Sequence, residues 1–237
     1  MNEEKKRVQE HSASMHYGSG VMHYTTQYCG EIFRQNMVSD GSVLELGPAE
    51  GDMTDILYPV FSTDYTVVDG ADEFVTEIKN RYQNIKGEAC LFEDFRPEGG
   101  YDNIVLGHVL EHVIDPVDIL KRCRTWLNGD GRILAAVPNS ESLHRQAAVL
   151  MGMLSNTKQL NKTDEKNGHR RVYDLNTLKK DFNEAGLRII KTGGYWLKPL
   201  SNGQIDATWN HDMVNAFLKL GEKYPEIAGE IYIVAGR

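Results

Sequence analysis

Ser42-Val-Leu-Glu-Leu-Gly-Pro-Ala-Glu-Gly-Asp52 is the stretch that decides the fold of this chain. An apolar run leads into a glycine-containing turn, and the residues after that turn predict the start of a helix. Gly47 can adopt a positive φ, and both Gly47 and Gly51 let a ligand approach the main chain closely. In an open α/β sheet such a turn lies at the carboxyl end of a strand, where ligands bind.

Strands alternate with helices from residue 42 to residue 137. We expect strands at 42–46, 65–69, 88–91, 101–106 and 131–137, with helices ending near residue 60 and at 73–82 and 116–126. This alternation predicts right-handed βαβ units and a parallel sheet. Farther along we expect helices at 142–154 and 175–185, a strand at 187–192, a loop and helix within 202–220, and a last strand at 230–234 that can insert antiparallel. The predicted fold class is α/β, with a doubly wound, mostly parallel, seven-stranded Rossmann-like sheet.

The domain prediction has three parts. Residues 1–38 are expected to form an N-terminal helical lid over the glycine turn, with 1–14 loosely ordered and a helix at about 22–38. Residues 39–237 are expected to form one α/β domain. Within it, residues 139–173 break the alternation and are expected to be an insertion on the substrate side, a usual place for specificity.

Composition narrows the functional class. The net charge of −8 argues against a broad nucleic-acid surface, which needs clustered Lys and Arg. No apolar run is long enough to predict a membrane span, and the first residues lack the apolar core of a secretory signal. The three cysteines are unclustered, which favours reduced thiols in a cytoplasmic protein. We expect a monomer or a homodimer whose partner is a small molecule.

Acidic residues follow the ends of several predicted strands. Asp69 ends the second strand, where a carboxylate can accept hydrogen bonds from ribose hydroxyls. Glu93 or Asp94, after the third strand, can accept from the exocyclic amine of an adenine, between the apolar rings of Phe92 and Phe95. Glu45 and the carbonyl of residue 107 are candidate acceptors for a free amino group. The set fits a nucleoside with an amino-acid tail.

Two known types of phosphate-binding turn match this stretch less well. A dinucleotide turn has the pattern G-x-G-x-x-G, whereas this chain has Ala49 in place of the second glycine. Glu50 and Asp52, beside the start of a helix, would also repel a pyrophosphate. A P-loop is excluded because no Gly-Lys-Ser/Thr follows the turn.

Four motifs together resemble a known family. The Glu-Leu-Gly-x-Ala-x-Gly turn, the acid Asp69, the loop Phe92-Glu-Asp-Phe95 and the stretch Leu106-Gly-His-Val-Leu-Glu-His-Val113 resemble the class I S-adenosylmethionine-dependent methyltransferases. The last stretch is especially similar to small-molecule O-methyltransferases that act on ubiquinone precursors, sugars and similar metabolites. The resemblance covers about residues 40–138 and implies a seven-stranded methyltransferase sheet. One departure is Pro48, which lacks an amide donor.

The resemblance implies where S-adenosylmethionine binds. Glu45, Gly47 and Gly51 would line the methionine moiety, Asp69 would bind the ribose, residues 93–95 would surround the adenine, and Gly107 and His108 would lie beside the sulfonium. The complete predicted cofactor site is Tyr24, Glu45, Gly47, Glu50, Gly51, Asp69, Gly70, Glu93, Asp94, Phe95, Gly107 and His108.

The acceptor side is predicted from polar residues near other strand ends. A hydroxyl acceptor benefits from a general base with a pKa near 7, which favours histidine, and we name His108 and His169 as catalytic candidates. The arginines of Gly168-His-Arg-Arg-Val-Tyr173 suit an anionic acceptor. The predicted substrate-binding residues are His16, Tyr17, His112, Arg170, Arg171, Tyr173, Trp196, Lys198 and Asn202. No metal site is predicted, because no carboxylates and histidines share a tight ligand spacing.

These observations predict a methyltransferase that transfers a methyl group from S-adenosylmethionine to an oxygen of a small polar, anionic or sugar-like metabolite. Three alternatives stay open: N-methylation of a small amine, a module that binds the cofactor without turnover, and a dehydrogenase, which Ala49 and the acids of the turn disfavour.

Overall fold

A computed structural model of the chain describes residues 3–12 and 19–237. Seven strands form one sheet in the order β3-β2-β1-β4-β5-β7-β6. They are β1 Val43–Leu46, β2 Tyr65–Asp69, β3 Lys86–Ala89, β4 Tyr101–Gly107, β5 Leu127–Pro138, β6 Arg188–Tyr195 and β7 Glu230–Gly236. β1 to β5 are parallel, and β7 runs antiparallel to both of its neighbours, β5 and β6. This confirms the predicted α/β class, the mostly parallel sheet and the inserted last strand.

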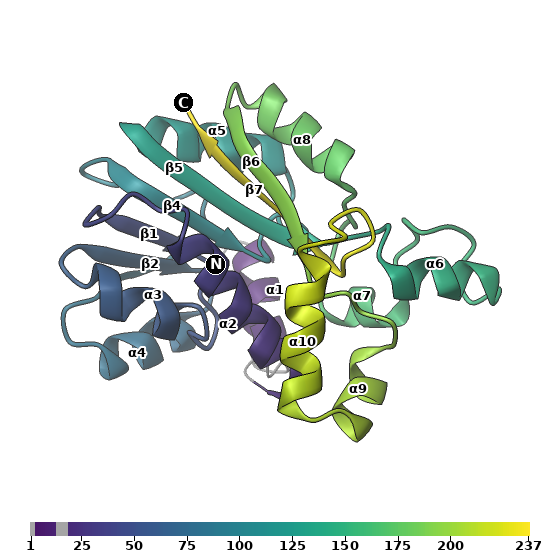
Figure 1. Ribbon diagram of the computed structural model, residues 1–237. Helices are drawn as coiled ribbons and strands as arrows, with labels where there is room; N and C mark the ends of the chain where they lie inside the picture. Colours follow the sequence, from purple (N-terminus) through teal and green to yellow (C-terminus); the bar gives the residue numbers. More distant parts are fainter. Residues whose placement is uncertain (1–2, 13–18) are drawn as a thin grey trace.

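Helices cover both faces of the sheet (Figure 1). They are α1 Glu3–Ser12, α2 Gly20–Arg34, α3 Thr54–Phe61, α4 Asp72–Arg81, α5 Pro116–Trp126, α6 Leu143–Leu150, α7 Lys162–Lys166, α8 Leu175–Glu184, α9 Asn202–Thr208 and α10 His211–Gly221. α5 and α8 pack on one face, and α2, α3 and α10 pack on the other.

The alternation of side chains along the strands explains the two layers. Leu44 and Leu46 of β1 point into the cluster under α5 and α8, whereas Val43 points into the cluster under α2, α3 and α10. Because both faces are covered, β1 and β2 are buried along their whole length, as expected for a parallel sheet.

Some predicted bounds were wrong in informative places. Residues 3–12, expected to be loosely ordered, form α1. The polar stretch 155–168 contains α7, whose capping box joins Asn161 and Asp164. The segment 202–220 contains two helices, because Asn210 caps α10 through a side-chain bond to the amide of Met213.

The order of the strands fixes where a ligand binds. The chain passes from β1 outward to β2 and β3, and then returns to the other side of β1 with β4. Such a reversal opens a crevice at the carboxyl ends of the two central strands. Within the described residues, no helix is long and apolar enough to cross a membrane.

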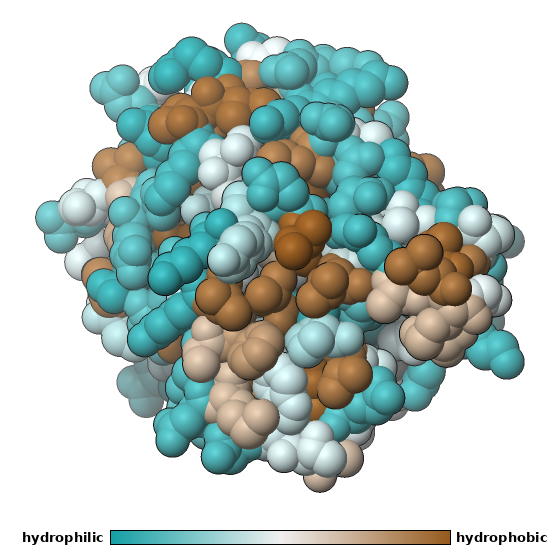
Figure 2. Space-filling view, turned by 45° about the vertical axis from the view of Figure 1, so that its right-hand side comes forward, coloured by the Kyte–Doolittle hydropathy of each residue, from teal (hydrophilic) through white to brown (hydrophobic). Residues whose placement is uncertain are grey.

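The face of the molecule in Figure 2 carries hydrophobic patches among hydrophilic residues. Leu150, Met151 and Met153 are exposed at the end of α6, which projects from the body of the molecule on the right of Figure 1. α6 belongs to the segment 139–173, the predicted insertion, whose residues 161–169 return to the cavity wall.

Candidate active site

A cavity of about 590 Å³ lies at the carboxyl ends of β1, β2, β4 and β5. Thirteen of the predicted site residues line it: Glu45, Gly47, Glu50, Asp69, Gly70, Glu93, Gly107, His108, His112, His169, Trp196, Lys198 and Asn202. The predicted residues that do not line it are Tyr24, Gly51, Asp94, Phe95, Arg170, Arg171 and Tyr173. His16 and Tyr17 lie outside the described residues.

Glu45 is buried on β1 at the base of the cavity. Its Oε2 accepts hydrogen bonds of 2.7 Å from the hydroxyls of Thr54 and Tyr65. Burial raises the pKa of Glu45 to about 7, although these two hydrogen bonds favour the ionised form. A ligand ammonium would favour the carboxylate, so Glu45 is suited to an amino-acid tail.

Asp69 ends β2 and faces the glycine turn. Its carboxylate accepts from the amides of Ala71, at 2.8 Å, and Ala49, at 3.4 Å. Burial raises the pKa of Asp69 to about 6 against the effect of these amides. Ala49 has a φ of 47°, in the left-handed region that favours glycine. The turn therefore keeps the backbone conformation of a glycine at a position that carries a methyl group.

The two glycines of the turn play different parts. Gly47 has a φ of 68°, and a Cβ there would lie 2.9 Å from Cγ2 of Val109. It needs both the conformation and the space of a glycine. Gly51 has a φ of 88°, but its missing Cβ faces Ile78 and Arg81 of α4, away from the cavity. Gly47 thus lines the cavity, whereas Gly51 serves the backbone of the turn and its packing on α4.

The loop after β3 divides its side chains between the cavity and the core. Leu91, Phe92 and Glu93 line the cavity. The amides of Asp94 and Phe95 both bond to the carbonyl of Leu91, so the chain reverses there. Phe95 therefore points into the core, where its ring meets Trp126 edge-on, and Asp94 is exposed. Of the predicted set 93–95, only Glu93 faces the cavity.

α1 covers one side of the cavity. Val8 packs on Gly70, where an added Cβ would lie 2.8 Å from Cγ1 of Val8. Lys5 donates to the carbonyl of Ala89 and lies 3.3 Å from the carboxylate of Asp72. The charged N-terminal segment is therefore anchored to the ends of β2, β3 and α4.

α2 contributes a different face from the one predicted. Met22, Thr25 and Thr26, which share one side of the helix, line the cavity. Tyr24 points elsewhere, and its ring contacts His211 of α10 at a centroid distance of 4.7 Å. The predicted cofactor contact of Tyr24 is thus replaced by contacts of its helical neighbours.

His108 follows β4 and lines the cavity. Its Nδ1 is 3.5 Å from Oε1 of Glu111 and 3.8 Å from Oε2 of Glu230, and its Nε2 is 3.3 Å from the hydroxyl of Tyr195. Burial alone would lower the pKa of His108, but the two carboxylates outweigh it and raise the pKa to about 9. At neutral pH His108 is a hydrogen-bond donor rather than a base.

Arg170 and Arg171 hold the loop after β4 instead of facing the cavity. Arg170 donates to the carbonyl of His112 and pairs with Glu4 of α1. Arg171 donates to the carbonyls of Leu110, Val113 and Ile114. Their guanidinium groups are committed to the protein's own backbone, which corrects the prediction that they bind an anionic acceptor.

Tyr173 is also structural. Its side chain is buried in the core, and its hydroxyl donates to Asp181 of α8 at 2.8 Å. The three predicted substrate residues of the segment 170–173 thus do not line the cavity, and they bond to the protein around it.

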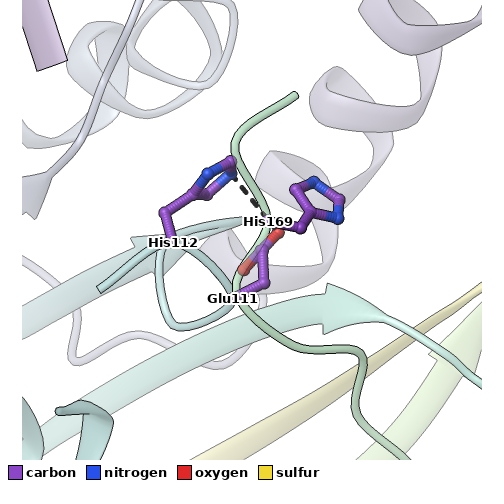
Figure 3. Close-up of side chains that lie close together, drawn as sticks. All are labelled: Glu111, His112 and His169. Carbon is purple, nitrogen blue, oxygen red and sulfur yellow. Dashed lines mark ion pairs between the residues drawn. The ribbon is translucent and has the colours of Figure 1, made fainter. Parts of the chain in front are cut away.

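The remaining predicted residues do meet at the cavity. Figure 3 shows His112 and His169 on either side of Glu111. The rings of His112 and His169 meet edge-to-face at a centroid distance of 4.8 Å. Lys198 and Asn202 line the cavity from the segment after β6. Burial lowers the pKa of Lys198, although the side chain keeps some exposure.

Sequence reasoning missed several lining residues: Glu111, Asn139, His144, Arg145, Asp164 and Glu230. Glu111 belongs to the stretch 106–113 and lies between His108 and His112, which were both predicted as site residues. Glu230 begins β7, and only the antiparallel insertion of that strand beside β5 brings it to the carboxyl end of β5. No spacing in the sequence signals that contact.

Comparisons of the chain with known protein families and solved structures agree with this geometry. A family model described as "Methyltransferase domain" matches residues 22–192. No curated protein matches the chain in sequence.

Solved structures show the same fold at low identity. A S-adenosylmethionine-dependent methyltransferase from Mesorhizobium loti superposes with a TM-score of 0.65 at 13% identity, covering 87% of this chain and 96% of that one. The 1,6-didemethyltoxoflavin-N1-methyltransferase of Burkholderia thailandensis, solved with 1,6-didemethyltoxoflavin and S-adenosylhomocysteine, gives 0.60 at 14% identity, with coverage of 89% and 77%.

The N-methyltransferase NodS of Bradyrhizobium japonicum WM9, in complex with S-adenosylhomocysteine, gives a TM-score of 0.58 at 14% identity, with coverage of 91% and 86%. The family match covers more than half of the chain, and the fold and the cavity at the switch point agree with it. The chain therefore belongs to the methyltransferase domain family, and its fold is that of the class I S-adenosylmethionine-dependent methyltransferases.

Proposed function

We propose that the protein transfers the methyl group of S-adenosylmethionine to an oxygen of a small polar metabolite. The donor would occupy the side of the cavity lined by Glu45, Gly47, Asp69 and Glu93. Buried carboxylates there match its ammonium group and ribose hydroxyls. The acceptor would occupy the side beyond Gly107, between the histidines and Lys198.

We favour an oxygen acceptor over a nitrogen acceptor because of the position of Lys198. The side chain of Lys198 lines the cavity, and its ammonium makes no hydrogen bond with the described residues. Burial lowers the pKa of this partly exposed lysine, and an acceptor oxygen that accepts a hydrogen bond from the ammonium would offset its loss of water. His108, His112 and His169 line the same end of the cavity and would orient the acceptor hydroxyl, whose proton leaves to solvent as the C–O bond forms.

The transfer itself needs little from the protein. The sulfonium is already activated, and alignment of donor and acceptor can lower the barrier by about 7–11 kcal/mol in favourable cases. The acceptor oxygen donates an electron pair to the methyl carbon and forms the C–O bond. The C–S bond breaks at the same time, and the electrons of that bond stay on sulfur.

N-methylation is the second candidate. Glu111 and Glu230 place two carboxylates near the acceptor end, and they could hold a cationic amine. Two of the similar structures are N-methyltransferases by name. A protein that binds the cofactor without turnover is the third candidate.

A screen of hydroxylated and amine metabolites with a labelled methyl donor, followed by mass spectrometry of the product, tests these candidates. We expect an O-methylated product, and Lys198→Met should raise the acceptor KM about tenfold or more while the Kd for S-adenosylhomocysteine stays constant. An N-methylated product would select the second candidate, and cofactor binding with no product across the screen would favour the third.

A monomeric or homodimeric state and a cytoplasmic location remain predictions from the sequence, which light scattering and cell fractionation test.

A further inference from the structure

Glu111 is the most unusual polar group in the cavity wall. Its side chain is 1% exposed, and neither carboxylate oxygen accepts a hydrogen bond from the described residues. A buried carboxylate normally accepts several hydrogen bonds, because losing water otherwise costs several kcal/mol. Its close neighbours are imidazole nitrogens, at 3.5 Å in His108 and 4.0 Å in His112.

Glu111, His112 and His169 lie close together in the cavity wall (Figure 3). One ligand atom from each lies within 4.8 Å of the other two. The atoms around a tetrahedral zinc ion, each bonded at about 2.1 Å, lie about 3.4 Å apart. The ligand atoms would therefore have to approach one another by up to about 1.4 Å to close around an ion.

The backbone of the site is already fixed. The amide of Arg170 bonds to the carbonyl of Glu111, and its guanidinium bonds to the carbonyl of His112. Arg171 ties down the rest of the loop through three further carbonyls. The two segments that carry the ligands are thus held in register by the arginines that face away from the cavity.

His169 also has the support that metal-binding histidines need. Its Nδ1 lies 3.5 Å from Oδ1 of Asp164, and Asp164 is held by Arg145 through a 2.9 Å ion pair. Nδ1 makes no hydrogen bond with the described residues at this distance, and a proton on it, facing the carboxylate, would leave the lone pair on Nε2. A carboxylate behind a ligating imidazole is the usual second layer of such a site.

The geometry points to a binding site for a divalent transition-metal ion formed by Glu111, His112 and His169, with its open coordination position turned to the acceptor. Two imidazoles and one carboxylate suit Zn²⁺, Co²⁺ or Fe²⁺, whereas Mg²⁺ and Ca²⁺ prefer oxygen ligands. The three residues line the cavity, and two of them, Glu111 and His112, follow within five residues of Gly107, beside which the sulfonium is expected.

The role of the ion rests on the proposed function. A hydroxyl of the acceptor that binds the ion becomes more acidic, as bound water does. Its proton leaves to solvent, the metal-bound oxygen forms the C–O bond with the methyl carbon, and the C–S bond breaks with its electrons on sulfur. The ion thereby both positions the acceptor oxygen and ionises it.

The test begins with Co²⁺, whose visible absorption reports ligand number and geometry. Chelator-treated protein should bind one equivalent of Co²⁺, and Zn²⁺ should displace it while millimolar Mg²⁺ should not. Glu111→Gln, His112→Ala and His169→Ala should each weaken binding at least tenfold. Asp164→Asn should weaken it about 10–100-fold. His211→Ala, on exposed α10, is the matched control and should bind normally.

Calorimetry with S-adenosylhomocysteine separates the two proposals. Each variant should keep the cofactor affinity of the parent, which also shows that it folds. Absence of stoichiometric Co²⁺ binding in protein that binds the cofactor, or Co²⁺ binding unchanged by His169→Ala, would overturn the metal site and leave the methyltransferase proposal standing. Stoichiometric Co²⁺ binding lost in the three variants would uphold the site, even if no methyl transfer were found.

Discussion

Arg170 and Glu4 form an ion pair that joins the two ends of the cavity. Nη2 of Arg170 lies 2.9 Å from both carboxylate oxygens of Glu4. Glu4 belongs to α1, which covers the cofactor side, and Arg170 also bonds to the loop that carries His112. The N-terminal helix is thus tied to the acceptor side of the same cavity.

Glu4→Gln should loosen α1 without unfolding the protein, since a partly exposed ion pair contributes only about 0–1 kcal/mol. We expect S-adenosylhomocysteine to dissociate several-fold faster in stopped-flow experiments, and amides 3–12 to exchange faster with deuterium. Glu3→Gln, an exposed neighbour, is the control. An unchanged dissociation rate would mean that α1 does not restrict exit of the cofactor.

Asp69→Asn should raise the Kd of S-adenosylhomocysteine about 10–100-fold, which corresponds to about 1.4–2.8 kcal/mol. The substitution removes a buried carboxylate that would accept from the ribose hydroxyls. Asp94→Asn makes the same chemical change at an exposed position beside the cavity and should leave the Kd unchanged. Calorimetry decides, and equal effects of the two substitutions would place the ribose elsewhere.

Cofactor binding should strengthen as pH rises from about 5.5 to 8. The pKa of Glu45 is about 7 and that of Asp69 about 6, both raised by burial, so the empty site holds protons in this range. A bound ammonium and ribose favour the ionised carboxylates, and binding therefore releases protons. Calorimetry in buffers of different ionisation enthalpy measures this release. In Glu45→Gln the dependence near pH 7 should disappear; its persistence would exclude Glu45 as the source.

The turn offers a paired test of backbone strain. Ala49→Gly should stabilise the protein by about 0.5–1 kcal/mol, because a φ of 47° is unfavourable for a residue with a Cβ. Gly47→Ala should destabilise it by more than about 1 kcal/mol, since the added Cβ would meet Val109 at 2.9 Å. Thermal unfolding measures both, and the prediction fails if the two shifts have the same sign.

The sequence predicted the parts of the fold that depend on local pattern. The second strand, at 65–69, and the helix 116–126 with proline at its first turn match the structure at both ends. Both have strong local signals, an apolar β-branched run in one and a helix start in the other. The resemblance likewise depended on short motifs around strand ends, which survive at low overall identity.

The candidate site was harder to predict because residues that are close in sequence point their side chains into different parts of the structure. Phe95 lies two residues from Glu93, yet a turn sends one into the core and the other to the cavity. Arg170 and His169 are adjacent, yet the arginine supports the loop from outside while the histidine lines the cavity. The side of a loop on which a residue lies depends on tertiary contacts, which residue type alone does not encode.

The insertion of β7 between β5 and β6 has a consequence for how the molecule is made. β5 and β6 have no common partner until residues 230–236 have left the ribosome, and Glu230 reaches the acceptor end only when that strand docks. The donor side, built from β1 to β4, is synthesised in the first half of the chain. Translation therefore delivers the strand-end residues of the proposed donor side long before Glu230 is available to the proposed acceptor end.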